Sequence, residues 1–122
     1  MEIISRTENG LVIAIVKSND MLLITDVQSA LDLMATVRYE ADSNRIILHK
    51  RAICEEFFDL KTRLAGEILQ KFVNYQTKIA IVGDFSTYSS KSLRDFIYEC
   101  NNGTDIFFVR SEDEAINKLS SI

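Results

Sequence analysis

Residues 78–109, KIAIVGDFSTYSSKSLRDFIYECNNGTDIFFV, decide the fold because they hold two short apolar runs on either side of an amphipathic segment. The runs are Lys78–Val82 and Ile106–Val109, and each is typical of a strand buried on both faces. Two such strands joined through a helix predict a parallel pair with a right-handed crossover. This unit therefore predicts an α/β fold.

The segment between the two runs predicts the helix. Ser89 or Ser90 is suited to cap its amino end, because a Ser hydroxyl accepts a hydrogen bond from a free N–H of the first turn. Asn101-Asn102-Gly103 is suited to end it, since these residues accept the left-handed conformation. The apolar stripe between these boundaries consists of Leu93, Phe96, Ile97 and Cys100.

The alternation of strands and helices continues on both sides of this unit. Arg45–Leu48 (RIIL), ending at His49, predicts another buried strand, and Phe57–Phe72 predicts the helix after it. In that helix the small residues Ala65-Gly66 would let helix and sheet approach closely. Ser111–Glu114 (SEDE) is a capping box that opens a last helix. The inward positions of the last helix are Ala115, Ile116 and Leu119.

The amino-terminal part predicts a hairpin and one more helix. Asn9-Gly10 is the strongest short hairpin signal, and Leu11–Val16 (LVIAIV) follows it as a buried strand. Met21–Ile24 predicts a short extra strand. Thr25–Gln28 (TDVQ) is a capping box with Thr25 as the cap. The apolar stripe of the helix that it opens is Val27, Ala30, Leu31, Met34 and Val37.

These elements predict one α/β domain over residues 1–122. An N-terminal β-hairpin is followed by alternating helices and strands, with a mostly parallel five-stranded sheet and about four helices.

Composition narrows the functional classes. The 122-residue chain is 47% hydrophobic and 26% charged, which favours a folded domain with a core over a disordered chain. One histidine and two cysteines are too few for a Cys/His zinc site, and we predict no metal and no cofactor. The net charge of −4 argues against a nucleic-acid partner.

The sequence also predicts a location. It has no apolar run long enough to span a membrane, which takes about 20 residues, so no membrane partner is expected. Its start, MEIISRTENG, lacks the basic residues and apolar run of a signal peptide. Cys54 and Cys100 form no CxxC pair. We therefore predict a cytoplasmic protein with reduced thiols.

Polar side chains follow the predicted strands at the edge where open α/β sheets bind ligands. His49 ends one strand, Asp84 and Ser86 follow the next, and Ser90 and Lys91 begin the helix after that loop. If the strands are neighbours, these residues bring an imidazole, a carboxylate, hydroxyls and a cation to one edge. We take these five residues as candidate ligand-binding residues.

No catalytic residue is predicted. The loop and helix start at residues 83–92 end in Lys-Ser, as a phosphate-binding loop does, but Phe85 and Ser90 stand where that loop needs glycine. A triad of Ser86, His49 and Asp84 is not required by the spacing, and Ser86 lies in no GxSxG elbow. The sequence favours a protein that is not an enzyme.

The thiols and the loop aromatics complete the set of candidate residues. Cys100 falls on an apolar stripe and is expected in the core, while the charges of Glu55 and Glu56 beside Cys54 disfavour a thiolate. Phe85 and Tyr88 lie in a loop. There they would either cover a pocket, or anchor a partner protein, or pack over the edge of the sheet. The sequence leaves these three alternatives open.

Four blocks carry a resemblance to a known family: DVQSALDLM, FFDLKTRLAGEILQKF, KIAIVGDFSTYSSKSLRDFIYE and EDEAINKL. They resemble a small bacterial family of uncharacterised proteins, domain of unknown function forty-one-eighty, over essentially the full chain. The resemblance implies a family but no activity.

The element order more distantly resembles the SpoIIAA-like (STAS) fold of anti-anti-sigma factors and transporter tails. That resemblance implies docking of partner proteins, often under control of a phosphorylated Ser or Thr in an Asp-Ser-Ser-Gly-type motif. The matching region, Arg51–Leu60 (RAICEEFFDL), holds no Ser, Thr or Gly, so we expect no such switch here. Small-molecule-binding relatives of that fold would instead imply a pocket between the second helix and the sheet.

Together these observations predict a non-enzymatic protein-interaction or regulatory module with a STAS-like fold, whose partner is another protein or a second copy of the chain. The alternative is a small-molecule or anion-binding protein, or an enzyme, that uses the strand edge around His49 and Asp84.

Overall fold

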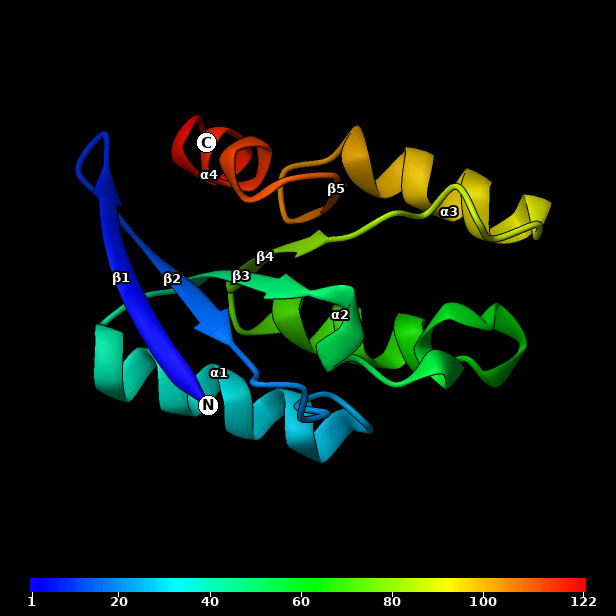
Figure 1. Cartoon of the computed structure of the whole chain (residues 1–122), viewed down its shortest axis with the longest axis horizontal. Coiled ribbons are helices and arrows are strands. Elements are labelled where there is room, and N and C mark those ends of the chain that lie inside the picture. The colour runs from blue at the N-terminus through cyan, green and yellow to red at the C-terminus, as the bar shows by residue number, and fades with distance from the viewer.

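The computed structural model describes all of residues 1–122 and shows a five-stranded sheet with four helices. The strands lie side by side in the order in which they occur in the chain (Figure 1). The first two are antiparallel, and all later neighbours are parallel. This confirms the predicted α/β fold with its N-terminal hairpin. The strands are β1 (Glu2–Glu8), β2 (Leu11–Lys17), β3 (Arg45–His49), β4 (Lys78–Val82) and β5 (Ile106–Val109).

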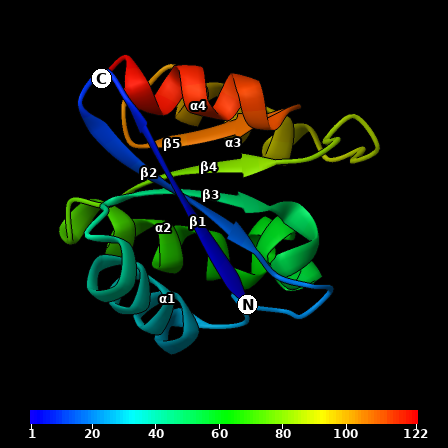
Figure 2. The same ribbon diagram turned by 60° about the vertical axis from the view of Figure 1, so that its left-hand side comes forward.

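Three helices cover one face of the sheet and the fourth covers the other. Figure 2 shows the first two helices on one side of the strands and the last helix on the opposite side. The crossovers from β2 to β3, from β3 to β4 and from β4 to β5 each lead to the next strand on the same side. Because these crossovers have the same handedness, their three helices lie on the same face of the sheet. The helix after β5 packs on the opposite face. The helices are α1 (Val27–Ala41), α2 (Leu64–Asn74), α3 (Lys91–Asn101) and α4 (Glu112–Ser120).

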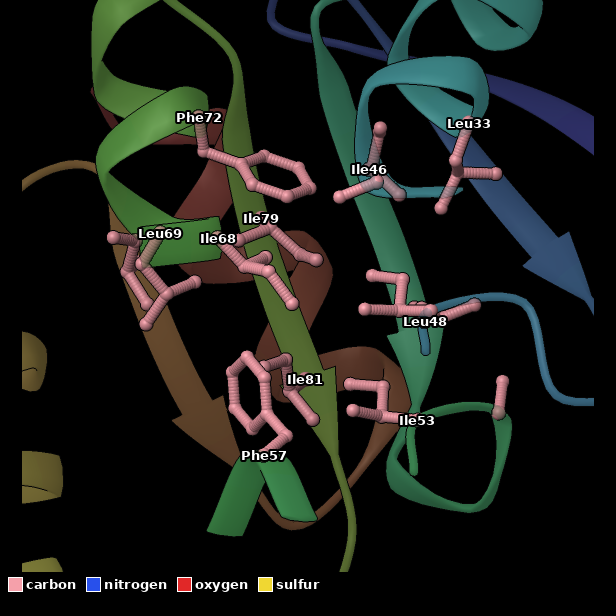
Figure 3. Packing of buried hydrophobic residues seen from close by; sticks show 14 of the residues in the cluster. Leu33, Ile46, Leu48, Ile53, Phe57, Ile68, Leu69, Phe72, Ile79 and Ile81 are labelled. Atoms are coloured by element: carbon pink, nitrogen blue, oxygen red, sulfur yellow. The ribbon is translucent and has the colours of Figure 1, made fainter. Parts of the chain in front are cut away.

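Strict alternation along the strands builds a core on each face. In β4, Ile79 and Ile81 belong to the larger cluster, under α1, α2 and α3, whereas Ala80 lies in the smaller cluster under α4. The larger cluster includes Phe57, Phe72 and aliphatic side chains of the strands (Figure 3). Burial on both faces explains why β2, β3, β4 and β5 are apolar runs without polar alternation.

The hairpin turn is formed as predicted. Asn9 and Gly10 adopt φ of 52° and 78°, the left-handed values that a two-residue turn requires. The turn sets the register of the first pair, with Glu8 opposite Leu11 and Glu2 opposite Lys17.

The predicted helix at Phe57–Phe72 is wrong in its first half, because α2 begins only at Leu64. Residues 55–58 and 60–62 form separate 3₁₀ turns, and Arg63 has a left-handed φ of 64°. Phe57 and Phe58 are both buried, whereas an α-helix turns adjacent side chains about 100° apart. The Thr62 hydroxyl donates to the carbonyl oxygens of Glu56 and Asp59, a local bond that competes with a continuous helix.

The first helix begins one residue later than predicted. Asp26 is its cap, because the Asp26 carboxylate accepts the N–H of Ser29 at 2.7 Å and the Ser29 hydroxyl accepts the N–H of Asp26 at 3.1 Å. The capping box therefore consists of Asp26 and Ser29 instead of Thr25 and Gln28. The predicted strand Met21–Ile24 is also wrong, since only a single bridge joins Ile24 to Ile53.

Two smaller predictions need correction. Gly66 is exposed and has open space beside it, so only Ala65 of the two small residues is buried against the core. The end of α3 is not left-handed: Asn102 has φ of −84°, and Gly103 has no positive φ. Ser90, one of the two predicted caps, does cap α3.

Candidate functional site

His49 lies at the carboxyl end of β3, where it lines a pocket of about 330 Å³ on the α4 side of the sheet. Its ring is half-buried, and its Nδ1 accepts the N–H of Arg51 at 3.2 Å, which caps a short 3₁₀ turn. This bond requires the unprotonated Nδ1, so the observed geometry belongs to the neutral imidazole. The pocket is lined by Lys17, Ser18, Asn19, Asp20, Ile47, His49, Arg51, Val82 and Glu112.

The charges around His49 come from separate parts of the chain. Lys17 at the end of β2 pairs with Glu112 in the first turn of α4, with Nζ and Oε2 2.9 Å apart. Arg51 and Asp20 add one charge of each sign to the lining. The pocket thus joins the ends of two neighbouring strands to the start of α4, the edge where open α/β sheets hold their sites.

The surroundings of His49 lower its pKa below the ordinary value. Loss of contact with water is the largest cause, followed by the positive charges of Arg51, Lys50 and Lys17. Both causes disfavour the imidazolium. His49 is therefore held as a neutral group with one acceptor nitrogen already engaged by the backbone.

Asp84 and Ser86 lie together, apart from the His49 pocket. The Asp84 carboxylate accepts both the N–H and the hydroxyl of Ser86, at 2.9 Å and 2.6 Å, in a turn closed by its own side chain. These two bonds are the main cause of a lowered pKa at Asp84. Both residues border a hollow of about 200 Å³ with Gly83 and Arg110.

Ser90 and Lys91 are already engaged in local bonds on α3. The Ser90 hydroxyl accepts the N–H of Leu93 at 3.2 Å, and Lys91 pairs with Asp95 one turn later at 2.7 Å. The structure therefore places the five predicted residues in three separate groups, with Asp84 beside Ser86 and His49 by itself. No hydrogen bond joins His49 to Asp84 or Ser86.

Sequence reasoning missed Lys17 and Glu112, which share the His49 pocket. Lys17 could have been predicted from the sequence, because it directly follows the buried run Leu11–Val16 and therefore lies at the carboxyl end of a strand. Glu112 could not have been predicted, since its place beside Lys17 depends on α4 crossing to the second face of the sheet.

The loop aromatics pack over the sheet edge, one of the three alternatives that the sequence left open. Tyr88 stacks on Phe58 with ring centroids 5.3 Å apart, and Phe85 meets Phe108 edge-on at 5.3 Å. Lys50 fastens the loop, with Nζ donating to the Asp84 carbonyl oxygen at 2.6 Å and lying 5.1 Å from the Tyr88 ring.

Gly83 explains how closely Lys50 approaches this loop. A Cβ atom at this position would come within 2.6 Å of the Lys50 side chain, so only glycine leaves room for that side chain in its present place. The Tyr88 hydroxyl faces Glu55, and burial together with this carboxylate raises the pKa of Tyr88 to about 12.

Both thiols have raised pKa values, as expected for unreactive cysteines. Burial is the largest cause of the raised pKa at Cys54, and Glu56 adds to it. Burial together with Glu99 raises the pKa of Cys100 to about 11. No group of three or more His, Cys, Asp and Glu side chains is arranged to hold a metal ion. No helix is long and apolar enough to cross a membrane.

The sequence matches one protein family over residues 8–119, which is nearly the whole chain and includes β2 to β5, α1 to α3 and all but the last residue of α4. The chain belongs to the DUF4180 family, described as a domain of unknown function. A search of curated proteins found no match. The DUF4180 match confirms the family that the four sequence blocks indicated.

Proposed function

We propose that this DUF4180 chain is a non-enzymatic protein-interaction module. The observation that carries this proposal is a pair of exposed apolar side chains beside one groove, Met1 and Leu22, which we call the N-terminal patch. Their exposed fractions are 47% and 55%. Grouped apolar side chains on a surface are typical of protein-contact sites.

The N-terminal patch borders a shallow groove of about 270 Å³. Met1 and Leu22 line this groove together with Leu23 and Leu33, and Asp32 adds a charge at its border. An apolar centre with a polar border is the usual composition of a protein interface. The STAS resemblance supports the same function, because proteins of that fold act by docking partners.

The placement of the polar residues also supports a binding module over an enzyme. The Asp84 carboxylate accepts a hydrogen bond from Ser86, and the Lys91 ammonium group forms an ion pair with Asp95. Neither Asp84 nor Lys91 therefore interacts with His49. An acid–base pair works only within hydrogen-bond reach of the same reacting atom.

The test compares Leu22→Asp with Tyr39→Asp, a matched control because Tyr39 is 90% exposed on α1 and lies outside the N-terminal patch. Affinity capture from cells that express the chain, with quantitative mass spectrometry, is expected to recover a stoichiometric protein partner with wild type and the control. Leu22→Asp should lose it. Recovery of the same proteins by all three variants would contradict the proposal.

A second candidate function is binding of a small anionic metabolite in the His49 pocket. The observation that favours it is the presence of Lys17, His49 and Arg51 around one hollow at the carboxyl ends of β2 and β3. A thermal-shift screen of anionic metabolites should then find a ligand that stabilises wild type, since a ligand that binds only the folded state raises its stability.

The matched variants for that screen are His49→Ala, Asp84→Asn and Arg94→Ala. The stabilisation should vanish in His49→Ala and persist in Arg94→Ala, which removes an exposed cation on α3. Asp84→Asn shows whether the hollow beside Ser86 takes part. If no metabolite shifts the melting temperature of wild type, this second function loses its support.

A further inference from the structure

The outer edge of β1 is an open sheet edge. β1 pairs with β2 along all seven of its residues, and no strand pairs with its other side. Ile4, Ser5, Arg6 and Thr7 are all exposed. The pairing with β2 is regular over the whole strand, without the bulge or proline that natural edges commonly use to prevent further pairing.

The hairpin turn determines which backbone groups face outward. A two-residue turn closes on a pair that exchanges both hydrogen bonds, here Glu8 and Leu11. Bonded and unbonded pairs then alternate, so Glu2, Ile4 and Arg6 direct their N–H and C=O groups towards β2. Ile3, Ser5 and Thr7 direct theirs towards the free edge, where another strand can accept them.

A second copy of the chain can pair with this edge in very few registers. A two-fold axis perpendicular to the sheet keeps each side chain on its own face, so residues opposite each other must both be even-numbered or both odd-numbered. Three registers overlap along at least five residues of β1, with Ile4, Ser5 or Arg6 opposite its own symmetry mate. The Arg6-centred register places two like charges in direct opposition on the axis, which leaves the Ile4-centred and Ser5-centred registers.

Charge distinguishes these two registers. With Ile4 on the axis, Glu2 stands opposite Arg6 of the other copy, and symmetry repeats this attractive pair. With Ser5 on the axis, Glu2 stands opposite Glu8, which places two carboxylates in direct opposition twice. Like charges directly opposite in a sheet are destabilising and opposite charges are favourable.

We infer that β1 pairs antiparallel with β1 of a second copy, with Ile4 on the two-fold axis, to form a continuous ten-stranded sheet. Ile4 is 41% exposed in the single chain and becomes covered by its symmetry mate. Ile3 and Ser5 exchange backbone hydrogen bonds across the axis. Arg6, which already pairs with Glu8 of its own chain at 2.9 Å, gains Glu2 of the other copy as a second carboxylate partner.

Charge reversal tests the register. Glu2→Arg and Arg6→Glu each place like charges opposite one another at both symmetric positions, and each should raise the dimer dissociation constant by about tenfold. The double variant Glu2→Arg/Arg6→Glu restores opposite charges and should restore dimerisation. Analytical ultracentrifugation over a range of concentrations measures all four proteins. A wild type that stays monomeric throughout that range would overturn the inference.

Cysteine crosslinking distinguishes the two registers directly. Ile4→Cys places two thiols on the axis in an unbonded pair, whose Cα atoms lie about 4.5 Å apart, within disulfide range. Ser5→Cys is the matched control, because the Ile4-centred register keeps its two thiols out of range. Mild oxidation should crosslink Ile4→Cys only. Crosslinking of Ser5→Cys instead would overturn the register. Wild type, whose thiols are Cys54 and Cys100, is the background control and should not crosslink.

The dimer edge and the N-terminal patch meet at Met1, which directly precedes Glu2, but their tests use residues that belong to only one of the two surfaces. Leu22→Asp should leave the dimer intact, and Arg6→Glu should leave capture of the protein partner intact. Either proposal can therefore fail while the other stands.

Discussion

The two faces of the sheet differ in how completely they are covered. α1, α2 and α3 cover one face with a large core, whereas α4 alone covers the other. α4 begins at Glu112, and the strand ends at Lys17 and His49 meet it only at its first turn. The lightly covered face therefore keeps an open pocket at the strand ends. Its single helix leaves space for a ligand, while the heavily covered face supplies most of the core.

The largest expected effect on stability lies on the heavily covered face. Phe72 is fully buried in the larger cluster, and Phe72→Ala should lower the free energy of unfolding by about 4 kcal/mol through lost burial and a cavity. Urea unfolding followed by circular dichroism measures the change. A loss smaller than that from any single truncation under α4 would contradict the comparison.

A smaller loss is expected on the face covered by α4. Leu119 is fully buried there, and Leu119→Ala should cost about 3 kcal/mol. α4 packs on its face without a neighbouring helix, so it can shift to fill part of the cavity more easily than α2, which packs beside α1. The same urea experiment checks it, and a cost above that of Phe72→Ala would show that the smaller cluster is the more important one.

Removal of the α4 cap should have a moderate effect. The Ser111 hydroxyl accepts the N–H of Glu114 at 3.1 Å, and Ser111→Ala should cost about 1 kcal/mol. Ser120→Ala, at the other end of α4, is the control and should change stability by less than about 0.5 kcal/mol. Equal losses in the two variants would mean that the cap bond contributes nothing specific.

The smallest effect concerns pH and the open pocket. The pKa of His49 is lower in the folded chain than in the unfolded chain, where it has the ordinary value of 6.5. As the pH falls below 6.5, His49 is therefore protonated in the unfolded chain before it is protonated in the folded chain, and this favours unfolding. The contribution of neutral His49 to stability is present above pH 6.5 and is lost as the pH falls towards its folded pKa.

His49→Asn should remove that part of the pH dependence. Thermal unfolding of both proteins measures the difference between about pH 7.5 and about pH 5, from roughly one unit above to roughly one and a half units below the ordinary histidine pKa. Asp26 and Asp84 also have lowered pKa values, but they contribute at more acidic pH and remain in both proteins. Parallel pH profiles for wild type and His49→Asn would contradict the assignment.

Local sequence signals predicted the five strands of the sheet correctly, although they added a strand at Met21–Ile24 that does not form, and they predicted the connections less well. The runs at β2 to β5 are apolar enough for burial on both faces, and that property requires no knowledge of distant residues. The prediction of a single helix over Phe57–Phe72 was wrong in its first half, because the composition of this segment suits a helix over its full length. Polar side-chain bonds at Thr62 and the simultaneous burial of Phe57 and Phe58 end that pattern, and the burial depends on the neighbouring sheet.

The succession of strands and helices, the hairpin turn, the inward side chains of α4 and the unreactive surroundings of the thiols follow from the sequence, because each depends on residues close together in the chain. Only the tertiary structure decided which polar residues share a site. Asp84 binds its neighbour Ser86, while His49 gains Lys17 and Glu112, from positions 32 residues earlier and 63 residues later. The reason is physical: a strand positions its own side chains, but the residues opposite them are set by the packing of separate elements.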